Sequence, residues 1–216
     1  MHVIYGGTFD PVHHGHLRLA LEVSERFEGA PVSLVPCHIP PHRGVTGATA
    51  QQRLRMLQQA IAGEPHLRID DRELTRGGAS YTADTLRQLR LELGDGEPLT
   101  MVVGTDAFAA FDHWKEWEQI PELAHIIVVR RPGITLNPET PPGRLLAERR
   151  AGGAEALRHC ASGYVLELDP PRLDISATGI RERLRKGRSA RYLVPETVLA
   201  EIHDMGLYRA CPVTKN

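Results

Sequence analysis

The chain has 216 residues, of which 41% are hydrophobic and 25% charged, and its 26 basic and 27 acidic residues give a formal net charge of −1. A chain of this length can bury roughly 70% of its unfolded surface, and the composition is too apolar for a disordered protein. The near-zero charge argues against a general binder of nucleic acid or of membrane surfaces, because such binding needs a strong positive field.

Three cysteines, Cys37, Cys160 and Cys211, are spread along the chain without a CxxC pair. An odd number at such spacing is not a disulfide framework and favours a reducing cytoplasm. The N-terminus MHVIY runs directly into turn residues, and no apolar run approaches the ~20 residues that span a bilayer. We therefore expect a soluble cytoplasmic protein; nothing in the sequence specifies an oligomeric state.

Short apolar runs alternate with segments of helical period. Strands are expected at 3–5, 32–35, 67–69, 99–103, 126–129 and 165–168. Helices are expected over 17–27, 54–61 and 86–93. This alternation predicts an α/β fold, in which an open and mainly parallel sheet carries helices on both faces.

We expect a single domain over residues 1–216, with a core over 1–174 and C-terminal helices over 175–210. The stretch 132–153, rich in Pro, Gly and Arg, is interpreted as an excursion with one short helix, not as a linker. Pro195 fits a helix start, and Gly206 lies just past that helix. Open parallel sheets bind ligands at the carboxyl ends of their strands, which directs attention to Gly6-Gly7 and to Gly104.

The segment GGTFDPVHHGHL, from Gly6 to Leu17, follows the first strand and opens a helix. The glycines allow close approach of a ligand, and a helix N-terminus favours phosphate. His13 and His16 share a helix face and could donate to charge that develops on phosphate. An exposed polar helix start and a metal site are the alternatives. No HExxH, GxxxxGK(S/T) or GxGxxG pattern is present, so neither a zinc protease motif nor the common nucleotide loops apply.

A second phosphate motif is expected at 175–181, which reads ISATGIR. Ser176 and Thr178 are good helix caps, and Arg181 can bind phosphate with two parallel hydrogen bonds. The alternative is a capped, basic and solvated helix.

These two segments resemble the GxFDPxHxGH and ISSTxIR motifs of the nucleotidyltransferases that share a fold element with class I tRNA synthetases. Ala177 departs from the second motif, which has Ser there. The resemblance implies a Rossmann-like sheet and nucleotidyl transfer, with His13, His16 and Arg181 as catalytic residues and His16 nearest the α-phosphate. The residues that it implies for ATP are Gly6, Gly7, Thr8, Phe9, His13, His16, Gly104, Asp106, Ser176, Thr178 and Arg181.

Four further segments, PPHR at 40–43, SYTADT at 80–85, GTD at 104–106 with Trp114, and RRPG at 130–133, resemble the bacterial nicotinate-nucleotide adenylyltransferase family. The residues implied for the acceptor are His42, Arg43, Thr82, Thr85, Trp114 and Arg130. His42 and Arg43 offer charge to a phosphate, and Trp114 offers a flat face to a pyridine ring. Thr82 and Thr85 lie where free backbone N–H groups could receive a carboxylate. Each has a structural alternative: a polar loop end, a packing tryptophan, or plain capping.

The implied reaction joins ATP and nicotinate mononucleotide to give nicotinate adenine dinucleotide and pyrophosphate. Mg²⁺ is expected to be held by ATP oxygens and water, with no protein metal site. The alternatives are another acceptor, chiefly nicotinamide mononucleotide, and a non-catalytic nucleotide sensor on the same fold.

Overall fold

A single parallel sheet organises the computed structural model of the chain, which describes residues 1–41, 44–130, 133, 135–171 and 173–209. Its strands are β1 (His2–Gly7), β2 (Val32–Pro36), β3 (Leu67–Ile69), β4 (Leu99–Gly104), β5 (His125–Val129) and β6 (Val165–Leu168). Their order in the sheet is β3-β2-β1-β4-β5-β6. The first half of the chain adds strands on one side of β1, and the second half adds them on the other side, beginning with β4. The topological switch point therefore lies between β1 and β4. The expected α/β fold is confirmed, and each expected strand is present.

The connections between the strands are mostly helical. The α-helices are α1 (His14–Arg26), α2 (Ala50–Ile61), α3 (Arg72–Arg76), α4 (Thr82–Leu93), α5 (Thr105–Phe108), α6 (Ile120–Leu123), α7 (Pro141–Glu148), α8 (Ala177–Arg185) and α9 (Glu196–Asp204). The described residues also form 3₁₀ turns at η1 (Phe111–His113), η2 (Trp117–Gln119) and η3 (Ala154–Arg158). In the described part of the chain, no helix is both long and apolar enough to cross a membrane.

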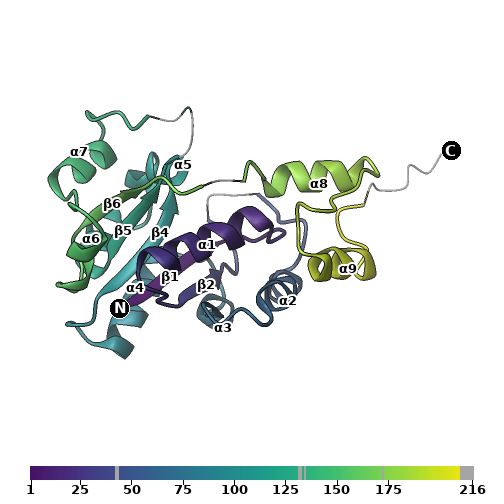
Figure 1. Ribbon diagram of the computed structural model, residues 1–216, viewed down its shortest axis with the longest axis horizontal. Helices are drawn as coiled ribbons and strands as arrows, with labels where there is room; N and C mark the ends of the chain where they lie inside the picture. The colour runs from purple at the N-terminus through teal and green to yellow at the C-terminus, as the bar shows by residue number, and fades with distance from the viewer. Residues whose placement is uncertain (42–43, 131–132, 134, 172, 210–216) are drawn as a thin grey trace.

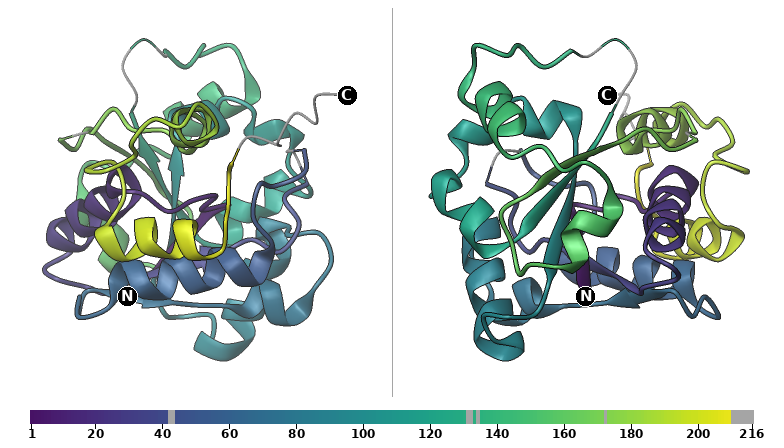
Figure 2. Two further views of the ribbon diagram at one scale, coloured as in Figure 1. Left: turned by 90° about the vertical axis from the view of Figure 1, so that its right-hand side faces the viewer. Right: turned by 60° about the vertical axis from the view of Figure 1, so that its left-hand side comes forward.

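Two hydrophobic cores lie on opposite faces of the sheet, because successive strand residues point to opposite sides. Val3 belongs to the core beneath α1, α2 and α9, whereas its neighbour Ile4 belongs to the core beneath α4, α5, α6 and α7. Figures 1 and 2 show this arrangement, with α7 on one side of the sheet and α8 and α9 on the side of α1 and α2.

Local chemistry explains several helix ends. Thr49 and Gln52 form a reciprocal capping box at the start of α2. Helix α4 ends at Gly94, whose φ of +81° suits glycine. Pro195 precedes α9, and Gly206 follows it with φ of +64°, as the sequence predicted. The one short helix expected within 132–153 is α7.

The C-terminal helices return to the N-terminal end of α1. Helix α9 packs beside α2, where Arg55 forms an ion pair with Glu201 at 2.8 Å. The backbone N–H of His14 donates to the carbonyl of Leu193 at 3.1 Å. Arg181 of α8 donates to the Asp10 carbonyl, so the two expected phosphate motifs meet at one end of the sheet, beside the β1–β4 switch point.

Candidate active site

The two histidines of the first turn form a stacked pair. His13 is the N-cap of α1, and its ring lies 3.6 Å from that of His16 at an interplanar angle of 21°. The predicted common face is confirmed. Gly15 leaves room for this stack, because a Cβ there would lie 3.0 Å from Nδ1 of His13. An alanine at this position would require the His13 ring to shift by a few tenths of an ångström.

Phe9 packs against the histidine pair through His16. Its side chain is 2% exposed, and its ring meets His16 edge-on with the centroids 5.1 Å apart. A Cβ at Gly7 would lie 2.8 Å from the Phe9 ring, so the glycine lets the turn close over the aromatic side chain. Phe9, which the resemblance implied for ATP, is thus placed as packing beneath the histidines.

Asp10 of the first turn is a buried junction between three parts of the chain. Its carboxylate accepts from the backbone N–H groups of Gly47 at 2.8 Å and Ala48 at 3.1 Å, and from the Tyr208 hydroxyl at 2.7 Å. Three donors to a carboxylate that is 4% exposed fix its orientation. Asp10 therefore joins the first turn to the 46–48 loop and to the C-terminal segment.

Helix α8 contributes the second phosphate motif to the same place. Ser176 caps the helix by accepting from the Gly179 N–H at 3.1 Å, as predicted. Arg181 donates to the Asp10 carbonyl at 2.7 Å and to the Thr178 hydroxyl at 3.2 Å. Two motifs separated by 171 residues in the chain are thereby in direct contact.

Arg53 is a further positioning residue, and no motif or spacing pattern in the chain marks it. It is fully buried in α2 and donates to the carbonyl oxygens of Thr8 at 2.7 Å, Cys37 at 2.7 Å and His38 at 2.9 Å. Its guanidinium holds the ends of the first and second strands together.

The segments that lead to the expected acceptor residues lie near the ends of neighbouring strands. Residues 38–39, which lead to the PPHR segment, pair with residues 79–80, which lead to α4: the His38 N–H donates to Ser80 Oγ at 2.8 Å. His42 and Arg43 themselves lie outside the described residues. The half-buried Trp114 packs against Phe111, with the ring centroids 5.2 Å apart.

Charged contacts join the loop of Trp114 to the start of α4. Lys115 forms an ion pair with Asp84 at 3.1 Å and lies 4.7 Å from the centre of the Tyr81 ring. Arg87 of α4 pairs with Asp84 at 3.1 Å and also with Glu116. The tryptophan face and the first turn of α4 consequently belong to one region of the surface.

Thr82 lies at the start of α4, whereas Thr85 is buried, which corrects the expectation that Thr85 contacts the acceptor. Thr82 is the first residue of α4, where backbone N–H groups lack helical partners. Thr85 is 1% exposed; its N–H donates to the Tyr81 carbonyl, and its hydroxyl donates to Glu73 at 2.6 Å and accepts from Arg76 at 3.0 Å. Thr85 is occupied within the fold and is not available to a carboxylate.

The remaining expected residues lie at the ends of β4 and β5. Gly104 is the N-cap of α5, and the exposed Asp106 follows in its first turn, so Asp106 is not itself the cap. The Thr105 hydroxyl donates to the Val129 carbonyl at 2.8 Å, which joins these strand ends beside the exposed Arg130.

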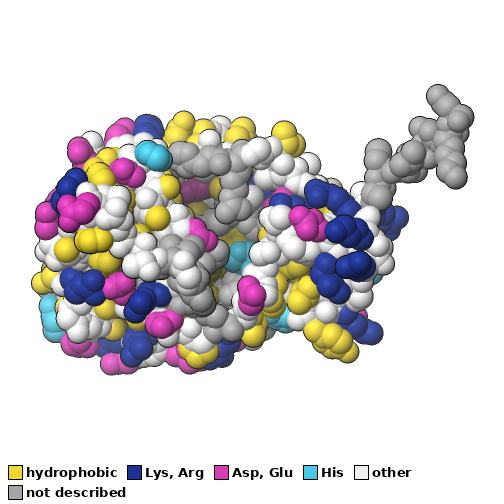
Figure 3. All heavy atoms as spheres, turned by 90° about the horizontal axis from the view of Figure 1, so that it is seen from above, with side chains coloured by type: hydrophobic (Ala, Val, Ile, Leu, Met, Phe, Trp, Pro, Cys, Tyr) yellow, Lys and Arg dark blue, Asp and Glu magenta, His cyan; other side chains and the backbone are white. Residues whose placement is uncertain are grey.

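Charge is unevenly distributed around this end of the molecule. Figure 3 shows Lys and Arg side chains gathered on the side of α8, which carries Arg183 and Arg185 and is followed by Lys186 and Arg188.

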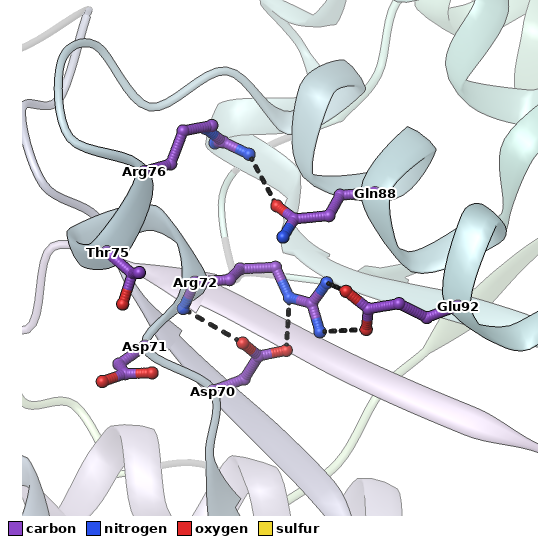
Figure 4. Close-up of a pocket in the computed structure, with 7 residues that line it drawn as sticks. All are labelled: Asp70, Asp71, Arg72, Thr75, Arg76, Gln88 and Glu92. Atoms are coloured by element: carbon purple, nitrogen blue, oxygen red, sulfur yellow. Dashed lines mark hydrogen bonds and ion pairs between the residues drawn. The ribbon is translucent and has the colours of Figure 1, made fainter.

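Figure 4 shows a separate polar pocket between α3 and α4, in which Arg72 pairs with Asp70 at 2.7 Å and with Glu92 at 2.9 Å. Arg72 is thereby neutralised by two carboxylates of the same pocket. Among the described residues, no three His, Cys, Asp or Glu side chains form a group that could hold a metal ion.

A parallel sheet with a histidine pair and a capped basic helix at its switch point defines a nucleotide-binding α/β protein. The family model described as cytidylyltransferase-like matches residues 4–183, and the chain belongs to that family. Within it, the chain belongs to the nicotinate-nucleotide adenylyltransferases. It is 65% identical to a probable nicotinate-nucleotide adenylyltransferase of Marinobacter nauticus over 99% of both chains. It is 46% identical to one from Cellvibrio japonicus, covering 95% of this chain and 97% of the relative.

Solved structures share the fold at low sequence identity. A Plasmodium falciparum nicotinic acid mononucleotide adenylyltransferase complexed with NaAD superposes with a TM-score of 0.74 at 17% identity, covering 95% of this chain and 96% of that one. A putative nicotinate-nucleotide adenylyltransferase from Vibrio parahaemolyticus gives a TM-score of 0.63 at 18% identity, covering 98% of both chains. These similarities confirm the Rossmann-like architecture.

Proposed function

We propose that the chain transfers the adenylyl group of ATP to nicotinate mononucleotide, giving nicotinate adenine dinucleotide and pyrophosphate in the synthesis of NAD. The observation that carries the proposal is the stacked pair His13 and His16 at the N-terminus of α1, joined through Asp10 to Arg181 of α8. Full-length relatives at high identity share this function by name. The sparse cysteines favour a cytoplasmic location, in which Cys37 and Cys160 are free thiols.

The reaction needs alignment more than acid–base chemistry. A phosphate oxygen of the mononucleotide attacks the α-phosphorus of ATP in line, and the bond to the pyrophosphate oxygen breaks. Because a phosphate monoester is largely ionised at neutral pH, no general base is required. The protein then contributes orientation and charge stabilisation.

The candidate residues divide between the two substrates. The N-termini of α1 and α8, with His13, His16 and Arg181, would meet the triphosphate and stabilise the departing pyrophosphate. Mg²⁺ enters as part of the substrate, bound by ATP oxygens and water. The first turn of α4 and the face of Trp114 would receive the nicotinate ring and its carboxylate.

A comparison of the acid and amide mononucleotides tests the acceptor assignment. A carboxylate accepts from every converging N–H group, whereas an amide turns its NH₂ toward one donor, at a cost of about 1–3 kcal/mol or more. We expect kcat/KM to favour the acid by at least about fivefold, measured by chromatographic separation of the dinucleotide product. Trp114→Ala should weaken acceptor affinity more than ATP affinity. Equal kcat/KM for both acceptors would overturn the substrate assignment, and no product from either would favour a nucleotide sensor.

A further inference from the structure

Tyr208 lies near the C-terminus, outside both phosphate motifs, yet its side chain reaches the first turn. It is 7% exposed, and its hydroxyl donates to Oδ1 of Asp10 at 2.7 Å across a separation of 198 residues. Burial, together with the hydrogen bond to Asp10 and its negative charge, raises the pKa of the Tyr208 hydroxyl. The hydroxyl therefore stays protonated and remains a donor over the whole physiological range.

The ring of Tyr208 is fitted to the neighbouring loop. A Cβ at Gly47 would lie 2.6 Å from the ring, so the loop passes the tyrosine at a distance that only glycine allows. The Gly47 N–H donates to Oδ2 of Asp10 at 2.8 Å. Tyr208 thus holds one carboxylate oxygen and packs against the backbone that holds the other.

Asp10 in turn contacts Arg181 through both its backbone and its side chain. The Arg181 guanidinium donates to the Asp10 carbonyl at 2.7 Å and lies 3.8 Å from Oδ2 of its carboxylate. Asp10 is also three residues from His13 in the same turn. A rotation of the Asp10 side chain would change the surroundings of the guanidinium and of the first turn together.

We propose that Tyr208 is a positioning residue for the ATP half of the site: by holding the Asp10 carboxylate it orients Arg181 and the start of α1 toward the triphosphate. This inference rests on the proposed function, in which Arg181 meets ATP. It also gives a role to a side chain that belongs to neither phosphate motif.

The test removes the hydroxyl and keeps the ring. In Tyr208→Phe we expect the Kd of a non-hydrolysable ATP analogue, measured by calorimetry, to rise about tenfold, while the Kd of nicotinate mononucleotide changes less than about twofold. Tyr192→Phe is the matched control, because Tyr192 is 83% exposed. Gly47→Ala would displace the Tyr208 ring from the loop side and would also meet Cδ of Arg181 at 3.3 Å. It should likewise give an ATP-selective loss, which provides a second variant if Tyr208→Phe folds poorly.

A double-mutant cycle with Asp10→Asn shows whether Tyr208 acts through Asp10. If it does, adding Tyr208→Phe to Asp10→Asn should weaken ATP-analogue binding by less than about twofold further. Additive losses, unchanged binding in Tyr208→Phe, or an equal loss for both ligands with a lowered melting temperature would each overturn the proposal. Lack of turnover by the wild-type protein would refute the proposed function alone, because analogue binding still decides the role of Tyr208.

Discussion

Replacing Arg53 by methionine should lower the free energy of unfolding by more than the same change at an exposed arginine. The side chain is fully buried, and its guanidinium donates to the carbonyl oxygens of Thr8, Cys37 and His38. A hydrogen bond that involves a charged group contributes about 1.5–3 kcal/mol, so three give an upper bound of roughly 9 kcal/mol. Removing the buried charge offsets part of this, and we expect a net loss of about 3–5 kcal/mol in the free energy of unfolding.

Thermal denaturation measures this loss. For a protein of this size, 1 kcal/mol corresponds to about 2–4 °C, so Arg53→Met should melt roughly 6–20 °C below the wild type. Arg68→Met, at an exposed position of β3, is the matched control and should melt within about 2 °C of the wild type. The KM values for both substrates should rise, because Arg53 holds the loops that lead to both halves of the site. A melting temperature of Arg53→Met equal to that of Arg68→Met would show that the three hydrogen bonds contribute little net stability.

Two further predictions concern histidines. His16→Ala should lower kcat by about 10²–10³ with little change in melting temperature, since it removes a charge-stabilising donor; near wild-type product formation would contradict its assigned role. His125 is buried in β5, where Nδ1 accepts from the Tyr164 N–H at 3.1 Å and Nε2 donates to the Cys160 carbonyl at 2.9 Å. Burial lowers the pKa of His125, so its contribution to stability is fully present above about pH 6.5 and is lost as the pH falls through the folded-state pKa. Urea unfolding between pH 5 and 8 should show that the free energy of unfolding falls as the pH is lowered. His125→Gln should make this dependence on pH shallower.

The sheet could be predicted from the sequence because its strands are short and mainly apolar runs bounded by turn residues. Strands buried on both faces need no partner information to be recognised. The short helices α3, α5 and α6, of four or five residues, were not predicted, because one turn is too short to show a helical period.

The histidine pair could also be predicted, because His13, the N-cap of α1, and His16 in its first turn are three residues apart. The contacts that hold the site together could not. Asp10 meets Tyr208 across 198 residues, and Arg53 binds backbone carbonyl oxygens, which every residue type supplies. Such contacts depend on the packing of distant elements and leave no spacing pattern in the chain.

Thr85 shows how a motif position can support a binding site without contacting the ligand. Its hydroxyl donates to the buried Glu73 carboxylate and accepts from Arg76, which fixes α4 against α3. Thr85→Val keeps the shape and leaves Glu73 without that donor, so we expect a loss of about 2 kcal/mol. This corresponds to a melting temperature roughly 4–8 °C lower, whereas Thr75→Val, at an exposed site of α3, should show little change.

The same variant separates support from direct binding. If Thr85 acts only through Glu73 and Arg76, the KM for nicotinate mononucleotide at a temperature well below melting should stay within about twofold of the wild type, because the free N–H groups of the first turn remain. If the hydroxyl bound the acceptor itself, the KM would rise about tenfold with no change in melting temperature. That second pattern would contradict the structural assignment of Thr85 and return it to the acceptor site.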